Sequence, residues 1–130
     1  MLIINGIKIK KVLWADETRE AKVFIFRRRD KTKETDSKLV QLKLTDVLWV
    51  EALGNYVRVN TNEEKFTVLT TMKEIESKLS NKEFVRVQRS FIVRIDKINS
   101  IEDNYIIIND KEIHIGKSYK EEFSKKLNIL

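Results

Sequence analysis

Gln88 and Arg89 stand side by side in an apolar segment, and both side chains can form paired hydrogen bonds to DNA bases. Arginine can bind guanine in this way, and glutamine can bind adenine, both in the major groove. The odd positions from Val85 to Ile95 are apolar except for Arg89. One continuous strand would therefore direct this guanidinium into the core, which is costly unless it is paired. We predict that a bulge or tight loop at residues 88–90 turns Arg89 outward; the alternative is a buried Arg89 that pairs with a carboxylate or with carbonyl groups.

Two further segments carry side chains suited to nucleic acid. Residues 116–120, Gly-Lys-Ser-Tyr-Lys, stand at the expected start of a helix, where free N–H groups and the helix dipole attract phosphate. Residues 54–58, Gly-Asn-Tyr-Val-Arg, combine an amide, a phenol and a guanidinium around a turn. Taken alone, the first segment is better explained as an ordinary capped surface helix, and a solvated hairpin tip explains the second at least as well as a ligand does. The basic run at residues 27–29 is better explained as part of a solvated loop.

The overall charge favours a polyanionic partner. The 130 residues include 26 basic and 20 acidic ones, which gives a net charge of +6. Lysine and arginine that neutralise phosphates release counterions, so a basic chain gains affinity for nucleic acid. Many lysine-rich proteins are merely well solvated, and the charge alone leaves both interpretations open. Hydrophobic residues make up 42% of the chain, which is sufficient for the core of one domain.

The residue types argue against catalysis and bound cofactors. His114, the only histidine, lies between two isoleucines and is expected to be an exposed strand residue. The sequence has no serine–histidine–aspartate arrangement, no metal-ligand cluster and no phosphate-binding glycine loop. We therefore expect no enzyme activity, no metal and no cofactor. Cysteine, a membrane-length apolar run and a signal peptide are all absent, so we expect a cytoplasmic protein without membrane insertion.

Alternating apolar residues predict a chain that is mainly antiparallel β-structure. Asn5-Gly6 is a strong hairpin signal because both residues tolerate positive φ angles. A second hairpin is expected around residues 109–111, and the polar residues 28–38 are expected to form a loop. The predicted strands cover residues 2–4, 7–9, 23–26, 40–44, 47–50, 56–61, 66–69, 105–108 and 113–115, and strand patterning also resumes at residue 84.

Two short helices are predicted among the strands. Residues 71–74 have the spacing of a capping box, in which side chains satisfy the free N–H groups at a helix start. Apolar residues then follow on one helical face, which predicts a helix at about residues 72–79. Residues 118–121 repeat the capping spacing and predict a second helix at about residues 118–127.

Three stretches, taken in order, resemble the motifs of the LytTR family of bacterial DNA-binding domains. Residues 46–57, DVLWVEALGNYV, are similar to its D-I-L-Y-I-E-A-x-G-x-Y segment. Residues 84–93, FVRVQRSFIV, resemble its F-x-R-V-H-R-S-Y-x-V segment. Residues 115–120, IGKSYK, resemble its V-S-R-S-Y-K ending. The likeness begins near residue 22, so we divide the chain into an N-terminal extension of unknown role, residues 1–20, and a LytTR-like domain, residues 21–130.

The resemblance implies a fold, a function and a set of contacts. It implies elongated antiparallel β-sheets whose loops enter successive major grooves of double-stranded DNA. The implied function is sequence-specific regulation of transcription at direct-repeat promoter sites, where two copies of the chain would meet on DNA. Carried over position by position, the expected contacts are Asn55, Tyr56, Arg58, Arg86, Gln88, Arg89, Ser90, Lys117, Ser118 and Lys120.

Several positions depart from the family pattern. Gln88 stands where the family often has histidine, and Lys117 replaces an arginine, so a forked guanidinium becomes a point charge. Gly116 replaces a serine, and Arg94 stands where asparagine is common. The preferred DNA sequence therefore cannot be transferred from relatives.

A protein-interaction or sensory β domain without DNA binding is the alternative. The apolar strands around residues 5–6 offer edges that a second copy or another protein can pair with.

Overall fold

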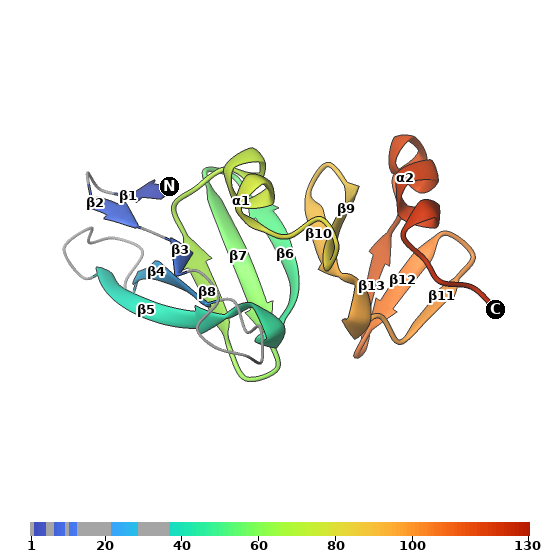
Figure 1. Cartoon of the computed structure of the whole chain (residues 1–130), viewed down its shortest axis with the longest axis horizontal. Coiled ribbons are helices and arrows are strands. Elements are labelled where there is room, and N and C mark those ends of the chain that lie inside the picture. Colours follow the sequence, from blue (N-terminus) through green and yellow to red (C-terminus); the bar gives the residue numbers. More distant parts are fainter. Residues whose placement is uncertain (1, 5–6, 10, 13–21, 29–36) are drawn as a thin grey trace.

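The computed structural model describes residues 2–4, 7–9, 11–12, 22–28 and 37–130 of the chain. Antiparallel strands dominate this part and form separate sheets along an elongated molecule (Figure 1). The largest sheet has five strands in the order β8-β7-β6-β10-β9. In chain order these are β6 (Val47–Leu53), β7 (Tyr56–Thr61), β8 (Lys65–Val68), β9 (Phe84–Gln88) and β10 (Phe91–Arg94).

Smaller sheets and short helices flank this five-stranded sheet. The N-terminal side holds β1 (Leu2–Ile4), β2 (Ile7–Ile9), β3 (Lys11–Val12), β4 (Lys22–Arg28) and β5 (Ser37–Lys43). The C-terminal side holds β11 (Ser100–Glu102), β12 (Tyr105–Ile108) and β13 (Lys111–His114). The helices are α1 (Met72–Lys78) and α2 (Lys120–Lys125), with 3-10 turns η2 (Leu44–Asp46), η3 (Ile95–Lys97) and η4 (Lys117–Tyr119).

Two hydrophobic cores lie on opposite faces of the five-stranded sheet. Successive residues of a strand point to opposite faces, so Phe84 of β9 enters the first core, and Val85 and Val87 enter the second. The first core also contains Leu42, Leu44, Val47, Val50, Val57, Val59, Phe66, Val68, Met72, Ile75 and Ile92. The second also contains Leu48, Val93, Ile106, Ile108, Ile113, Ile115 and Phe123. Strands β9 and β10 therefore join the C-terminal sheet and α2 to the rest of the domain.

The fold class predicted from the sequence is confirmed, since the described chain is mainly antiparallel β-structure with two short helices. The predicted N-terminal hairpin strands pair as expected, with Leu2 opposite Ile9, while residues 5–6 lie outside the described part. Residues 29–36 of the predicted polar loop also lie outside it, and the loop is shorter than predicted, because residues 28, 37 and 38 belong to β4 and β5. The division of the chain after residue 20 stays a prediction.

The two predicted helix caps have different outcomes. Thr71 caps α1 as predicted, since its hydroxyl oxygen accepts a hydrogen bond of 3.1 Å from the backbone N–H of Glu74. The second capping box is wrong. The N–H of Tyr119 bonds instead to the carbonyl oxygen of Gly116 at 2.9 Å, which closes η4 before α2 begins at Lys120. Ser118 therefore lies inside a 3-10 turn and makes no cap hydrogen bond.

Candidate nucleic-acid interface

The strand pattern around Arg89 is interrupted as predicted. Strand β9 ends at Gln88 and β10 begins at Phe91, and these two residues are paired across the hairpin. Arg89 and Ser90 therefore form a two-residue turn, and the register shifts just after Phe91. The Arg89 side chain is exposed and makes no hydrogen bond or ion pair with another residue of the described part. The alternative of a buried, paired Arg89 is wrong.

The turn between β9 and β10 is fixed by bonds to its two carbonyl groups. The carbonyl oxygen of Ser90 accepts a hydrogen bond of 2.9 Å from the N–H of Ala52 in β6. The carbonyl oxygen of Arg89 accepts one of 2.6 Å from Nη2 of Arg86. Nη1 of Arg86 lies 3.1 Å from Oε1 of Glu76 in α1. The backbone of the turn is thus tied to a neighbouring strand and, through Arg86, to a helix, while the Arg89 side chain is left free.

The segment around Lys117 lies directly against β9. The N–H of Gly116 donates a hydrogen bond of 2.7 Å to the carbonyl oxygen of Val87. Nε2 of Gln88 donates one of 2.8 Å to the carbonyl oxygen of His114. The side chains of Lys117, Ser118 and Lys120 are exposed beside this contact. Two of the three predicted segments are therefore adjacent, although the Gln88 amide is engaged within the protein. His114 is exposed, as predicted.

The remaining segment, residues 54–58, reaches the same end of the sheet. Phe91 pairs with Glu51 of β6, so the chain beyond Leu53 continues past the β9–β10 turn. There Gly54, with φ of +59°, and the exposed Asn55 connect β6 to β7. In Figure 1 the β9–β10 turn and α2 lie along the upper edge of the view. We call this edge, formed by the β6–β7 turn, the β9–β10 turn and residues 116–120, the turn edge.

The predicted residues differ in how free their side chains are. Asn55, Arg89, Lys117, Ser118 and Lys120 are exposed. Tyr56 and Ser90 are half-buried, and Tyr56 takes part in further interactions. Arg58 is half-buried on β7, where its Nη1 lies 3.9 Å from Oε1 of Glu51. At that distance the pair is a weak one.

Sequence reasoning missed the buried guanidinium of the hairpin, which belongs to Arg94. This residue is 4% exposed. Its Nε donates to Oδ1 of Asp96 at 2.8 Å, and its Nη1 donates to the carbonyl oxygen of Leu44 at 3.2 Å. The carbon of the guanidinium group also lies 5.2 Å from the centre of the Phe84 ring. The available signal was Asp96, two residues further along the chain, which can pair with an inward-facing Arg94.

These features define a mainly β domain that gathers exposed cations and the exposed amide of Asn55 on the turns of one edge. No group of three or more potential metal-binding side chains occurs in the described residues. No helix within those residues is long and apolar enough to span a membrane.

The chain belongs to the LytTr DNA-binding domain family, whose sequence model matches residues 37–128. The resemblance found in the motifs is thus confirmed. The sensory transduction protein LytT of Bacillus subtilis is 30% identical over 97 residues, which cover 70% of this chain and 40% of the relative. The transcriptional regulatory protein LytR of Staphylococcus aureus is 22% identical over 103 residues, covering 75% and 42%. The chain therefore spans less than half the length of these curated relatives.

A solved structure shows the same fold. It is the LytTr DNA-binding domain of a methyl-accepting/DNA response regulator from Bacillus cereus, with a TM-score of 0.67 and 24% sequence identity. The match covers 82% of this chain and 97% of that one.

Proposed function

We propose that this domain binds double-stranded DNA in a sequence-specific way and regulates transcription, with loops of the turn edge entering successive major grooves. Membership in a family of DNA-binding domains and the likeness to bacterial regulators support this function. The observation that carries the proposal is Arg89. It stands on a short turn whose backbone is fixed from two sides, and its own side chain has no partner in the described chain.

The exposed side chains have chemically distinct roles in this proposal. Arg89 presents a fork of N–H donors that matches the acceptor atoms of a guanine edge. Asn55 can pair in the same manner with adenine. Lys117 and Lys120 neutralise phosphates, which positions the domain on the duplex without reading sequence. The other candidates for the interface are Tyr56, Arg58, Gln88, Ser90 and Ser118.

The proposal extends to how the domain is used. A regulator with one short turn edge reads few base pairs, so two copies on a direct repeat would give a longer and rarer site. Because its target is bacterial DNA, we place its action in the cytoplasm. No catalytic step is part of this function.

Enrichment of bound duplexes from a randomised library, followed by footprinting, tests the proposal. We expect a defined sequence to emerge, and the footprint gives the repeat spacing and the number of copies bound. About five phosphate contacts predict a slope of about −4 to −5 for the logarithm of the binding constant against that of salt concentration. If no sequence is enriched over nonspecific competitor DNA, the domain is not a sequence-specific DNA-binding protein. Capture of a protein partner instead would then favour an interaction domain.

A further inference from the structure

Arg86 connects helix α1 to the turn that carries Arg89. Its guanidinium donates through Nη2 to the Arg89 carbonyl oxygen and through Nη1 to the carboxylate of Glu76. The Arg86 side chain is 21% exposed, against 45% for Glu76. The Nε atom of Arg86 is buried and has no partner in the described residues. This guanidinium is therefore committed to contacts within the protein and presents little of its donor surface to a ligand.

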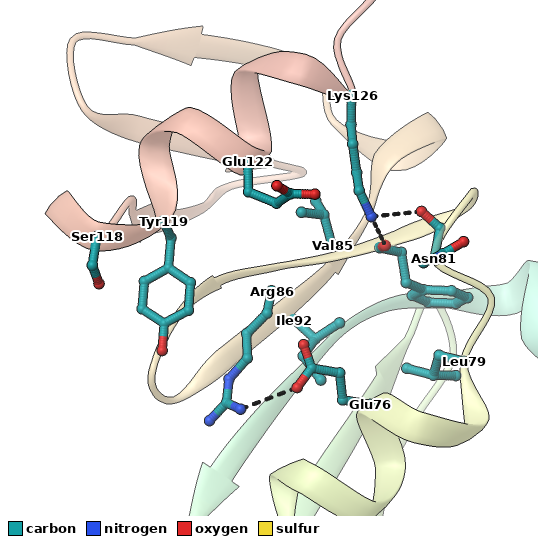
Figure 2. A pocket seen from close by; sticks show the side chains of 11 residues that line it. Glu76, Leu79, Asn81, Val85, Arg86, Ile92, Ser118, Tyr119, Glu122 and Lys126 are labelled. Carbon is teal, nitrogen blue, oxygen red and sulfur yellow. Dashed lines mark hydrogen bonds and ion pairs between the residues drawn. The ribbon is translucent and has the colours of Figure 1, made fainter.

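Arg86 lies beside a groove between helices α1 and α2 (Figure 2). Figure 2 shows Arg86 of β9 and Glu76 of α1 pointing toward each other along one side of this groove. The groove has a volume of about 330 Å³, and Glu122 of α2 lines its other side. Lys126, the residue after the end of α2, donates to the carbonyl oxygen of Asn81 at 2.6 Å, just before β9. Strand β9 is thus held between both helices, and the Glu76–Arg86 pair is the part of this support that reaches the turn.

We propose that Arg86 is a positioning residue and not a DNA contact, and that Glu76 sets the geometry of the Arg89 turn through it. This inference rests on the proposed function. A guanidinium that binds a carboxylate and a carbonyl group at once holds the two at a fixed separation, because its donors form a rigid planar fork. Without Glu76 the fork can rotate away from the turn. Arg89 would then enter a groove from a broader set of orientations, at an entropic cost to specific binding.

Replacing Glu76 distinguishes a positioning role of this residue from a purely electrostatic effect of its charge on DNA binding. The substitution Glu76→Gln removes a negative charge from a domain that meets a polyanion, so long-range electrostatics alone would tighten binding to every duplex. Positioning predicts the reverse for the preferred sequence. We expect Glu76→Gln to weaken binding to the enriched duplex roughly tenfold, the scale of one charge-assisted hydrogen bond. Binding to nonspecific duplex should be unchanged or tighter.

The matched control is Glu122→Gln on the opposite side of the same groove. Glu122 is exposed and makes no hydrogen bond or ion pair with another described residue, so its loss changes the charge alone. We expect this variant to bind both duplexes as tightly as the original domain or more tightly. If Glu76→Gln behaves like Glu122→Gln, Glu76 has no positioning role and the inference fails.

A substitution that preserves the charge of Arg86 distinguishes a positioning role from a contact with a DNA phosphate. Arg86→Lys keeps the positive charge that a phosphate contact requires, but one ammonium group cannot span both partners of the guanidinium. We expect Arg86→Lys to lose roughly tenfold in specific affinity, as Glu76→Gln does. In an Arg89→Ala background, Glu76→Gln should cause little further loss, because the two changes act through the same contact. Full affinity in Arg86→Lys, or independent losses in the double variant, would overturn the inference.

Hydrogen exchange in the free domain tests, without DNA, whether the Glu76–Arg86 pair holds the β9–β10 turn in place. The N–H of Ala52 bonds to the carbonyl oxygen of Ser90, so its exchange reports on the turn. Glu76→Gln and Arg86→Lys should speed exchange at Ala52 severalfold, whereas Val59 in the interior strand β7 should keep its protection. Unchanged exchange at Ala52 would show that the pair does not hold the turn. If the unsubstituted domain bound no duplex, the proposed function would fail, while this measurement would still decide whether Glu76 positions the turn.

Discussion

Two arginines, five residues apart on the β9–β10 hairpin, have opposite surroundings. Arg89 lies in the turn, is exposed, and has no side-chain partner among the described residues. Arg94 lies at the end of β10, is buried, and contacts Asp96, Glu83 and a backbone carbonyl group. The residue type is the same, so its surroundings decide its role. One end of the hairpin presents a free guanidinium, and the other uses a guanidinium to hold the chain together.

The same contrast extends to the two ends of the five-stranded sheet. The turns at the turn edge contain no carboxylate: they are Gly54-Asn55, Arg89-Ser90 and Lys117-Ser118-Tyr119. At the opposite end, the β7–β8 turn contains Glu63 and Glu64, and the β12–β13 turn contains Asp110. These two turns meet where Nδ2 of Asn109 lies 3.3 Å from Oδ1 of Asn62. The charges within these turns alone therefore favour a polyanion at the turn edge over the opposite end.

The largest expected effect is on stability, at the buried end of the hairpin. Arg94→Ala should lower the free energy of unfolding by about 3 kcal/mol, because a buried carbonyl group loses its donor and two carboxylates lose their counterion. Urea denaturation measures this change. The affinity of the folded variant for DNA should stay as it was. If the free energy of unfolding fell by less than about 0.5 kcal/mol, Arg94 would behave like an ordinary surface residue, and it would not differ from Arg89 in its contribution to stability.

The next effect is on DNA binding, at the turn edge. Arg89→Ala should cost about 1–3 kcal/mol in binding to the preferred duplex and relax discrimination at one base pair. The free energy of unfolding should change by less than about 0.5 kcal/mol, because the side chain is exposed and unpaired. Titrations against the preferred duplex and its single-base variants measure the first effect, and urea denaturation the second. Equal losses on all sequences would assign Arg89 to the phosphate backbone.

A smaller effect on DNA binding is expected from replacing a lysine, and it should depend on the end of the sheet at which the lysine lies. Lys120→Ala at the turn edge should weaken all duplexes about equally and reduce the steepness of the salt dependence by about 0.9, the contribution of one phosphate contact. Lys65 lies in the strand that leaves the β7–β8 turn and is exposed, so Lys65→Ala is the matched control. We expect its salt dependence to equal that of the original domain. A similar reduction in both variants would mean that DNA does not prefer the turn edge.

Local patterns in the sequence predicted the turn at Arg89, but they could not predict its supports. A strand alternates with a period of two, so one polar residue in an apolar series is sufficient to locate an interruption. Glu76 lies ten residues before Arg86 on a helix, and Leu44 lies fifty residues before Arg94. Such partners are set by the packing of distant segments, which no local pattern encodes. The sequence also predicted a base contact for Gln88, but the bond from its amide to the His114 carbonyl group depends on that same packing.

The same limit explains the different outcomes of the two capping boxes. The spacing of Thr71 and Glu74 is equal to that of Ser118 and Glu121, and local sequence alone treats them alike. Gly116 is held against β9 by its bond to Val87, and η4 follows directly from it. Ser118 is then already in a 3-10 turn, where its side chain does not cap the helix. A tertiary contact thus overrides a local signal.

The smallest expected effects concern the backbone conformation of two glycines at the turn edge. Gly54 has a φ of +59° with open space around it, so Gly54→Ala should cost about 1 kcal/mol in stability through backbone strain alone. Gly116 has an ordinary φ of −67°, but a Cβ there would lie 3.0 Å from the Tyr119 ring. A ring edge can shift, and alanine restricts the unfolded chain, so Gly116→Ala should change stability by less than about 0.5 kcal/mol. Thermal unfolding of both variants measures the difference. Equal costs would mean that crowding against Tyr119 at Gly116 matters as much as the φ angle does at Gly54, and the turn edge would then depend on side-chain packing as well.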